Sequence, residues 1–351
     1  MTSRILFILK RREDFDKNKH TANGMSTGLF NSASFMVDML TDMGIDAKIE
    51  VAIDNNCIDR LVTAHKPDIV IIEALWVVPD KFTVLSKLHP TVKWVIRLHS
   101  ELPFLAGEGM AFDWLGEYIT NPNVYIGVNA PRMLNETKIY LQCKQQWSDS
   151  ETDNRIFYLP NYYPQMFKDK IYNTDKDVID IGCFGAVRPL KNHMIQALAS
   201  IKFADNIGKK LNFHINADRM EMKGEPVMAN LKSIFQHLAN RGHRLVLHTW
   251  TDRDTFLELC GTMDIGLQVS FSETFNIVGA DIISQGVPLV GSIEIPWIDE
   301  LYTARAQYTD EIYKALILTH TGPENNVQRN RKKLIEYTTE TSNVWKQQFR
   351  G

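Results

Sequence analysis

Cysteine is scarce in this 351-residue sequence, and its four cysteines form no recognisable framework. They stand far apart, at Cys57, Cys143, Cys183 and Cys260, with no CxxC pair and no histidine at metal-binding spacing. A disulfide scaffold or a zinc site needs closer and more regular spacing. We therefore interpret the cysteines as free thiols of a reducing compartment.

Long apolar runs and a large net charge are also missing. The longest apolar stretch, Ile69–Val78, is interrupted by Glu73 and is too short to cross a bilayer. Met1–Lys10 holds one short apolar strand, whereas a secretory signal needs a longer apolar run and a cleavage site. We expect a cytoplasmic protein with no transmembrane segment, in the host cytoplasm if a bacteriophage encodes it. The formal net charge of −3 gives no global basic field for nucleic acid.

Short apolar strands alternate with amphipathic helices in the first half of the sequence. This alternation predicts a parallel sheet wrapped by helices. The expected strands are Arg4–Leu9, Ala47–Ile53, Asp68–Ile72, Lys93–Leu98 and Val124–Val128. The expected helices are Ser26–Met43, Ile58–His65, Lys81–Leu88, Trp114–Tyr118 and Pro131–Tyr140.

Two turn-rich segments, Tyr158–Pro164 and Lys168–Asp177, interrupt the alternation and indicate an interdomain connection. It then restarts with strands Val178–Phe184, Asn212–Asn216, Arg244–His248, Ile265–Val269 and Pro288–Val290. The helices expected between and after them are His193–Ala204, Val227–Asn240, Asp252–Leu259, Ile277–Gln285 and Asn325–Gln348.

The sequence therefore predicts an α/β protein of two Rossmann-like lobes. We expect an N-terminal domain over 1–164, joined by the C-terminal helix 335–351, and a C-terminal domain over 165–334. Ligands of such open sheets bind at the carboxyl ends of the strands, here facing a cleft between the lobes.

The segment Ser270–Val290 carries the strongest functional pattern. A strand ends near Ser270, a polar turn follows, and a helix begins near Asn276 with free N–H groups that favour an anion. Glu273 in the turn and Asp281 on the helix can bind hydroxyls at two ends of one ligand. The alternative is a plain strand–turn–helix with Ser272 as N-cap and a solvated aspartate.

This segment resembles the retaining glycosyltransferases of the GT-B fold, of the glycosyltransferase family 4 type (glycosyl transferases group 1). The matching residues are Glu273, Thr274, Phe275, Asn276 and Ile277, and then Gly286, Val287, Pro288, Leu289 and Val290. The resemblance implies that Glu273 contacts the donor sugar and that the backbone of Thr274–Ile277 cradles the donor phosphates. Asp281 stands where the family has a ribose-binding glutamate, one methylene longer.

A second segment, Asp180–His193, reads as a strand, a glycine-containing loop and a helix start, without the GxGxxG dinucleotide pattern. Arg188 and Lys191 are spaced to converge on one anion, and Gly185 permits close backbone approach. Fixed cations stabilise a departing pyrophosphate more in the transition state than in the ground state. The resembled family places Arg and Lys in the matching loop, although a basic loop beside a helix is the simpler interpretation.

Three further groups are weaker candidates. His99 follows the end of a strand, where the family often has a histidine that touches the sugar; equally, it is a histidine satisfied by loop backbone. Thr249 and Trp250 end a strand near the family's nucleobase and are expected to contact it mostly through backbone. The residues expected on the acceptor side, which are otherwise a solvated charge run with a loop glycine, are Lys10, Arg11, Arg12 and Gly24.

Asp252-Arg253-Asp254 spells the metal-binding DxD of a different glycosyltransferase fold. It follows Thr251 at an expected helix start, where acidic residues cap the helix. We interpret it as structural, and expect no metal site and no cofactor.

The resemblance implies metal-independent transfer of a sugar from a nucleotide-diphosphate sugar, such as a UDP- or GDP-sugar, to an acceptor hydroxyl with retention of configuration. A nucleotide-sugar epimerase of the same fold and a non-catalytic nucleotide-sugar-binding protein are the alternatives. The acceptor stays open among a glycan, a small molecule, a protein and hydroxymethylated DNA.

Overall fold

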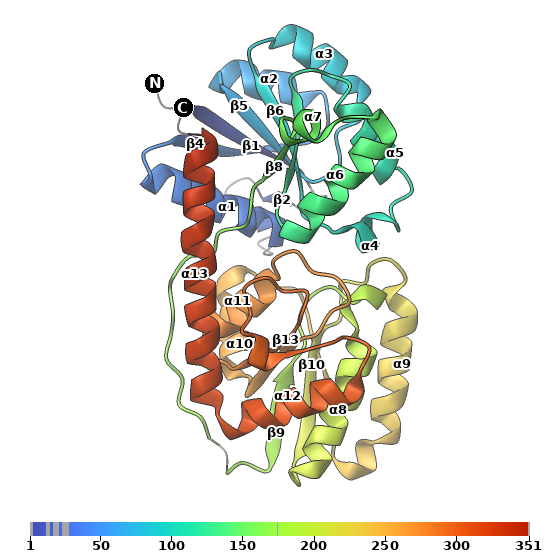
Figure 1. Ribbon diagram of the computed structural model, residues 1–351. Coiled ribbons are helices and arrows are strands. Elements are labelled where there is room, and N and C mark those ends of the chain that lie inside the picture. The colour runs from blue at the N-terminus through green and yellow to red at the C-terminus, as the bar shows by residue number, and fades with distance from the viewer. Residues whose placement is uncertain (1–2, 12–14, 17–20, 23–27, 174, 350–351) are drawn as a thin grey trace. The chain divides into compact units, whose positions relative to one another are not determined.

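The computed structural model describes residues 3–11, 15–16, 21–22, 28–173 and 175–349. Its contacts divide the chain into two compact units (Figure 1). Unit 1 comprises Met1–Pro164 with Thr338–Gly351, and unit 2 comprises Gln165–Tyr337. The last helix, α13 (Pro323–Phe349), therefore contributes residues to both units.

Unit 1 is built on a six-stranded parallel sheet in the order β4-β1-β5-β6-β7-β8. Its strands are β1 (Arg4–Lys10), β4 (Asp46–Ala52), β5 (Ile69–Glu73), β6 (Lys93–Leu98), β7 (Val124–Val128) and β8 (Ile156–Tyr158). Its helices are α1 (Gly28–Asp42), α2 (Cys57–His65), α3 (Asp80–Leu88), α4 (Leu102–Leu105), α5 (Ala111–Tyr118), α6 (Pro131–Gln145) and α7 (Asp149–Asp153). A separate two-stranded antiparallel pair joins β2 (Phe15–Asp16) and β3 (Thr21–Ala22).

The sheet of unit 1 is buried on both faces, as alternating side chains of β1 show. Leu6 and Ile8 pack into one hydrophobic cluster, whereas Ile5, Phe7 and Leu9 pack into another on the opposite face. The second cluster also contains Trp345 and Phe349 of α13. The end of the chain therefore completes the core around its first strand.

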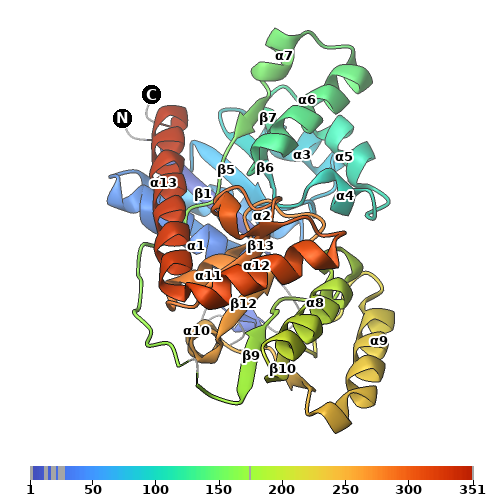
Figure 2. The ribbon, with the colours of Figure 1, turned by 60° about the horizontal axis from the view of Figure 1, so that its bottom comes forward.

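Unit 2 repeats the design with a second parallel sheet, in the order β11-β10-β9-β12-β13-β14. Its strands are β9 (Val178–Gly182), β10 (Lys210–Asn216), β11 (Arg244–His248), β12 (Ile265–Gln268), β13 (Leu289–Ser292) and β14 (Thr303–Ala304). Its helices are α8 (His193–Asn206), α9 (Gly224–His237), α10 (Arg253–Thr262), α11 (Ile277–Ser284) and α12 (Thr309–Thr321). Helices α8 and α9 lie on one side of the strands, and α10 and α11 on the other (Figure 1, Figure 2).

The predicted alternation of strands and helices is confirmed in both units, with two notable differences. Strand β8 begins before the segment expected to be a turn-rich connection and includes its first residue, Tyr158. Helices α4, α7 and α12 and strands β2, β3 and β14 were not predicted. All four cysteines are free thiols, as expected. Across the described ranges, none of the helices combines the length and apolarity that a bilayer span requires.

Candidate functional site

The turn between β12 and α11 is held by an unusual helix cap. Asn276, not Ser272, is the N-cap: its Oδ1 accepts the N–H of Gly279 at 2.7 Å. Asn276 adopts φ 61° and ψ 77°, a left-handed conformation that asparagine tolerates better than most residues. Its Nδ2 also donates to Gln268 Oε1 at 3.1 Å, which ties the cap back to the end of β12.

Aromatic packing fixes the same turn from the other side. The indole N–H of Trp297 donates to the carbonyl of Phe275 at 2.5 Å. The Phe275 ring packs against Trp297 and Tyr337, with ring centroids 6.0 and 5.6 Å away. The backbone of Thr274–Ile277 is therefore preformed, and the helix that starts there directs its positive dipole end toward the turn.

The two sequence motifs meet at Lys191 and Glu273, whose side chains form an ion pair. Both are largely shielded, with side-chain exposures of 13% and 8%. A backbone bond from Phe271 N–H to the Leu190 carbonyl, 2.9 Å long, joins the two loops beside the pair. An ammonium, a carboxylate and a helix start thus lie at the carboxyl end of the sheet of unit 2.

Arg188 lies in the same loop but has a different carboxylate partner. Its Nη1 is 3.2 Å from Glu221 Oε2, and Arg219 Nη2 is 2.6 Å from the other oxygen of Glu221. Sequence reasoning did not predict Glu221. A single parallel bridge, Val187 with Met220, brings its loop alongside.

Gly185 has φ +116°, a conformation that side chains rarely adopt. Its N–H donates to Asn216 Oδ1 at 2.9 Å. A Cβ at this position would meet no heavy atom within 4 Å, so the loop leaves open space beside the backbone here.

Asp281 is buried, and its Oδ1 lies 2.8 Å from Arg253 Nη2. The alternative of a solvated helix aspartate is therefore wrong. Arg253 is the central residue of the DxD-like segment, and Asp252 before it caps α10 by accepting the Thr255 N–H at 3.0 Å. Asp252 is thus the N-cap of α10, as the sequence predicts. Among the residues that the structure describes, no three His, Cys, Asp or Glu side chains gather as a metal site.

Thr249 and Trp250 directly follow β11, as predicted. The Trp250 N–H donates to Asp218 Oδ2 at 2.8 Å, so that backbone donor is already used. The Arg219 guanidinium lies 4.7 Å from the centroid of the Trp250 ring. The arginine that holds Glu221 therefore also covers the indole.

His193, the first residue of α8, is a buried group that sequence reasoning missed. It is 1% exposed, and within the described ranges neither ring nitrogen has a hydrogen-bond partner. Burial above all, and then the charges of Lys191 and Arg188, lower the pKa of His193 to about 3. The ring is therefore neutral at physiological pH beside two cations.

In unit 1, His99 lies directly after β6 and contacts a carboxylate. Its Nε2 pairs with Glu73 at the end of β5. Glu73 also accepts from Arg97 Nη1 at 3.0 Å. Burial lowers the pKa of His99 and the charge of Glu73 opposes it. The alternative, in which loop backbone provides the hydrogen-bond partner of His99, is therefore wrong for Nε2, whose partner is the Glu73 carboxylate.

Arg97 is fully buried and joins three parts of unit 1. It donates to the carbonyls of Leu159 and Pro160 at 3.1 and 3.3 Å, and its guanidinium lies 5.3 Å from the Trp345 ring centroid. Glu73 directly follows the expected strand Asp68–Ile72, and Arg97 lies within the expected strand Lys93–Leu98, but the pairing of the two side chains was not predicted. Glu73 and Arg97 are register partners between β5 and β6.

The acceptor-side candidates are only partly described. Lys10 ends β1 as an exposed residue, and the N–H of Arg11 donates to the Ala52 carbonyl at 2.7 Å. Arg12 and Gly24 lie outside the described residues.

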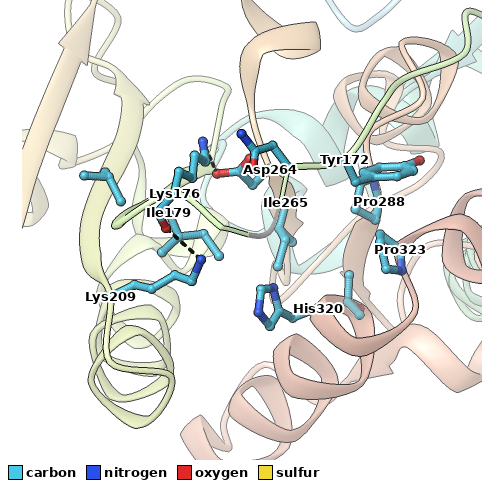
Figure 3. Close-up of a pocket in the computed structure, with 12 residues that line it drawn as sticks. Tyr172, Lys176, Ile179, Lys209, Asp264, Ile265, Pro288, His320 and Pro323 are labelled. Atoms are coloured by element: carbon cyan, nitrogen blue, oxygen red, sulfur yellow. Dashed lines mark hydrogen bonds and ion pairs between the residues drawn. The ribbon is translucent and has the colours of Figure 1, made fainter.

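A pocket of unit 2 lies at the opposite end of the sheet from the motif residues. It has an empty volume of about 390 Å³, open solvent included. Lys176 pairs with Asp264 at 2.5 Å, and its carbonyl accepts from Lys209 Nζ at 2.7 Å (Figure 3). Val178 and Ile265, the first residues of β9 and β12, help to line it. The pocket is therefore at the amino ends of the strands, where ligands of such sheets do not usually bind.

Two parallel six-stranded sheets, each wrapped by helices, define a protein of two Rossmann-like units. No family model and no curated protein matches the sequence. Solved structures of similar fold include the UDP-forming α,α-trehalose-phosphate synthase of Burkholderia vietnamiensis, at TM-score 0.70 and 10% identity, covering 99% of this chain and 96% of that one.

Two further similar structures have the same architecture. Sucrose-phosphate synthase of Thermosynechococcus elongatus has TM-score 0.67 and 11% identity, covering 99% of this chain and 98% of that one. Anabaena HepE in complex with UDP has TM-score 0.63 and 12% identity, covering 97% and 96%. These proteins are GT-B glycosyltransferases, and the likeness shows that this chain has the GT-B fold.

Proposed function

We propose that this protein is a glycosyltransferase that transfers a sugar from a nucleotide-diphosphate sugar to an acceptor hydroxyl. The observation that carries the proposal is the meeting of Lys191 and Glu273 beside the start of α11. Two loops more than 80 residues apart in sequence supply a cation for the phosphate and a carboxylate for the sugar hydroxyls. Both lie at the carboxyl end of the sheet of unit 2.

The roles of the residues follow from their charge. The N–H groups at the start of α11 and the Lys191 ammonium bind the diphosphate, and Arg188 turns from Glu221 toward it. Arg219 keeps Glu221 paired when Arg188 leaves. Glu273 accepts hydrogen bonds from the sugar, and Asp281 is proposed to reach the ribose.

The proposed reaction retains configuration and needs no metal ion. The bond from the anomeric carbon to the phosphate oxygen breaks, and the bond to the acceptor oxygen forms on the same face. The acceptor proton passes to the departing phosphate oxygen, so no side chain of this chain acts as nucleophile. Lys191 and Arg188 stabilise the charge that develops on the leaving group.

Unit 1 is proposed to hold the acceptor, with His99 as its contact to the transferred sugar. Glu73 fixes the orientation of the imidazole through Nε2. UDP is the first nucleotide to test, because HepE was solved with UDP and the trehalose-phosphate synthase is UDP-forming. The proposed location is the cytoplasm.

The test is product analysis by mass spectrometry after incubation with UDP- and GDP-sugars and each acceptor class. Free nucleoside diphosphate together with a glycosylated glycan, small molecule, protein or hydroxymethylated DNA supports the proposal. An epimerised sugar nucleotide would make the protein an epimerase. Tight binding without any product would make it a nucleotide-sugar-binding protein.

A further inference from the structure

Three ionisable side chains on one face of the sheet of unit 2 form a continuous hydrogen-bonded chain. Asp180 of β9 lies 3.1 Å from His214 Nε2, and His214 Nδ1 lies 2.8 Å from His248 Nε2. The two imidazole rings are nearly parallel, with centroids 5.1 Å apart and an interplanar angle of 13°, as an edge-to-edge hydrogen bond between ring nitrogens requires. The chain crosses β9, β10 and β11 toward the end of β11.

The direction of these hydrogen bonds follows from Asp180. Its carboxylate also accepts from Lys176 Nζ at 2.7 Å and from Asn212 Nδ2 at 2.8 Å. The hydrogen bond from His214, above all, holds the pKa of Asp180 well below its ordinary range. An ionised carboxylate only accepts, so His214 donates through Nε2 and its Nδ1 accepts from His248 Nε2–H.

This order leaves Nδ1 of a neutral His248 as a hydrogen-bond acceptor at the outer end of the chain. His248 is the last residue of β11, directly before Thr249 and Trp250, and is only partly buried. The ring of Phe184, 6.0 Å away between centroids, packs edge-on against it. An acceptor of fixed tautomer therefore lies at the carboxyl end of the sheet that also carries Lys191 and Glu273, where the donor is proposed to bind.

We propose that His248 determines base specificity by accepting a hydrogen bond from the ring N–H of uracil or guanine in the donor nucleotide. Asp180 and His214 are positioning residues that act through His248. The inference rests on the proposed function. Uracil N3 and guanine N1 carry a hydrogen, whereas the corresponding nitrogens of cytosine and adenine are acceptors and leave two lone pairs facing each other.

The same geometry makes base binding dependent on pH. A proton added at Nδ1 of His248 removes this acceptor, because the imidazolium donates through both nitrogens. The charged groups facing the pair are Asp180 and, behind it, Lys176; Asp218 and Arg219 contact Trp250, two residues after His248. Burial, and then His214, lower the pKa of His248. Affinity for the base is therefore lost as pH falls below the ordinary histidine range.

The first experiment needs no ligand. Nitrogen-15 NMR of the full-length protein at pH 8 is expected to show His248 protonated at Nε2 and not at Nδ1. In Asp180→Asn or His214→Phe, this single tautomer is expected to give way to a mixture. A wild-type signal from Nδ1–H would overturn the inference and leave the proposed function standing.

The second experiment compares UDP with N3-methyl-UDP, and GDP with N1-methyl-GDP, by calorimetry. The wild type is expected to lose on the order of 10-fold in affinity on methylation of the base that it reads, in line with one lost hydrogen bond. His248→Ala is expected to reduce that ratio several-fold and to flatten the fall of affinity between pH 7 and pH 5. His237→Ala, which removes an exposed histidine of α9, is the matched control and keeps both effects.

The outcomes separate the two claims. Nucleotide binding with the same methylation ratio in the wild type and in His248→Ala would overturn the base-reading role alone. Failure of every nucleoside diphosphate to bind the wild type would overturn the proposed function and the inference with it. The base is identified by the pair of nucleotides, UDP with N3-methyl-UDP or GDP with N1-methyl-GDP, in which methylation lowers the affinity most.

Discussion

Lys191 and Glu273 form an ion pair across 82 residues of sequence, with each side chain shielded from water by the two loops that carry them. A buried cation and a buried anion in contact are each costly to leave alone. A diphosphate that approaches Lys191 therefore meets a cation already oriented, and a sugar that approaches Glu273 meets an acceptor already in place.

Replacement of Arg188 by alanine is expected to weaken binding of the donor nucleotide by about 10- to 100-fold, the loss of one charge-assisted contact of about 1.5–3 kcal/mol. Stability should change little, because Arg219 still pairs with Glu221. Calorimetry with the nucleoside diphosphate measures the effect. Lys202→Ala, which breaks an exposed ion pair with Asp310 in the same unit, is the control. Equal affinity of Arg188→Ala and wild type would contradict the phosphate role.

Substitutions of the two carboxylates of the motif, Glu273 and Asp281, are expected to affect different steps. Glu273→Gln should mainly lower turnover and leave binding of the plain nucleoside diphosphate nearly intact, because an interaction stronger in the transition state appears in kcat. Asp281→Asn should weaken binding of the nucleoside diphosphate. It should also lower the stability of the protein, since Arg253 loses its buried charged partner. Kinetics, calorimetry and thermal unfolding on each variant separate the effects. Lost nucleotide binding in Glu273→Gln with unchanged binding in Asp281→Asn would refute the assignment.

Activity is expected to survive EDTA. The DxD-like segment caps α10 through Asp252, and two cations stand ready for the leaving group. Steady-state rates before and after chelation test this. Complete loss that Mn²⁺ or Mg²⁺ restores would show that the segment binds a metal.

The free energy of unfolding is expected to decrease as the pH is lowered, because of His193. In the unfolded chain this histidine takes up a proton near pH 6.5, whereas in the folded protein its pKa is lowered to about 3. Its contribution is complete above pH 6.5 and is lost progressively as pH falls toward 3, by about 2 kcal/mol at pH 5. Urea unfolding from pH 7.5 to 5 should show a shallower pH dependence in His193→Phe than in the wild type. Identical slopes would mean that the ring is accessible to protons in the folded state.

Arg97→Met is expected to destabilise unit 1 by roughly 3–5 kcal/mol, because it leaves the Glu73 carboxylate buried with one partner fewer. Hydrogen exchange of the β5 and β6 amides resolves this unit from the other. Lys138→Ala, which removes an exposed ion pair with Asp153, should cost less than about 1 kcal/mol. Similar exchange in the two variants would argue against a structural role for the buried pair.

The fold was predictable because buried parallel strands are short apolar runs, and helices between them show their own periodicity. Strand β8 was not predicted, because it has only three residues and its last residue, Tyr158, begins a proline-rich turn. The meeting of Lys191 with Glu273 was also predictable, since both follow carboxyl ends of strands in one sheet. The partners Glu221, Arg253 and Glu73 were not, because they depend on which loops and helices pack together.

The roles of the site residues remain predictions even where the contacts are known. The position of Asn276 as N-cap could have been guessed from its residue type, but its left-handed conformation is set by the bonds to Gly279 and Gln268. The Asp180–His214–His248 chain had no signal in the sequence. Its members lie about 34 residues apart, and only the strand order β11-β10-β9 makes them neighbours.

The position of Trp345 has a consequence for synthesis on the ribosome. Its ring stacks on Phe7 at 5.9 Å between centroids, and its indole N–H holds the Pro160 carbonyl at 2.9 Å. Unit 1 cannot close its core around β1 until the final turns of α13 have left the exit tunnel. β1, which is translated before unit 2, therefore keeps an exposed apolar surface while unit 2 is made, and during this interval the nascent chain is prone to aggregation.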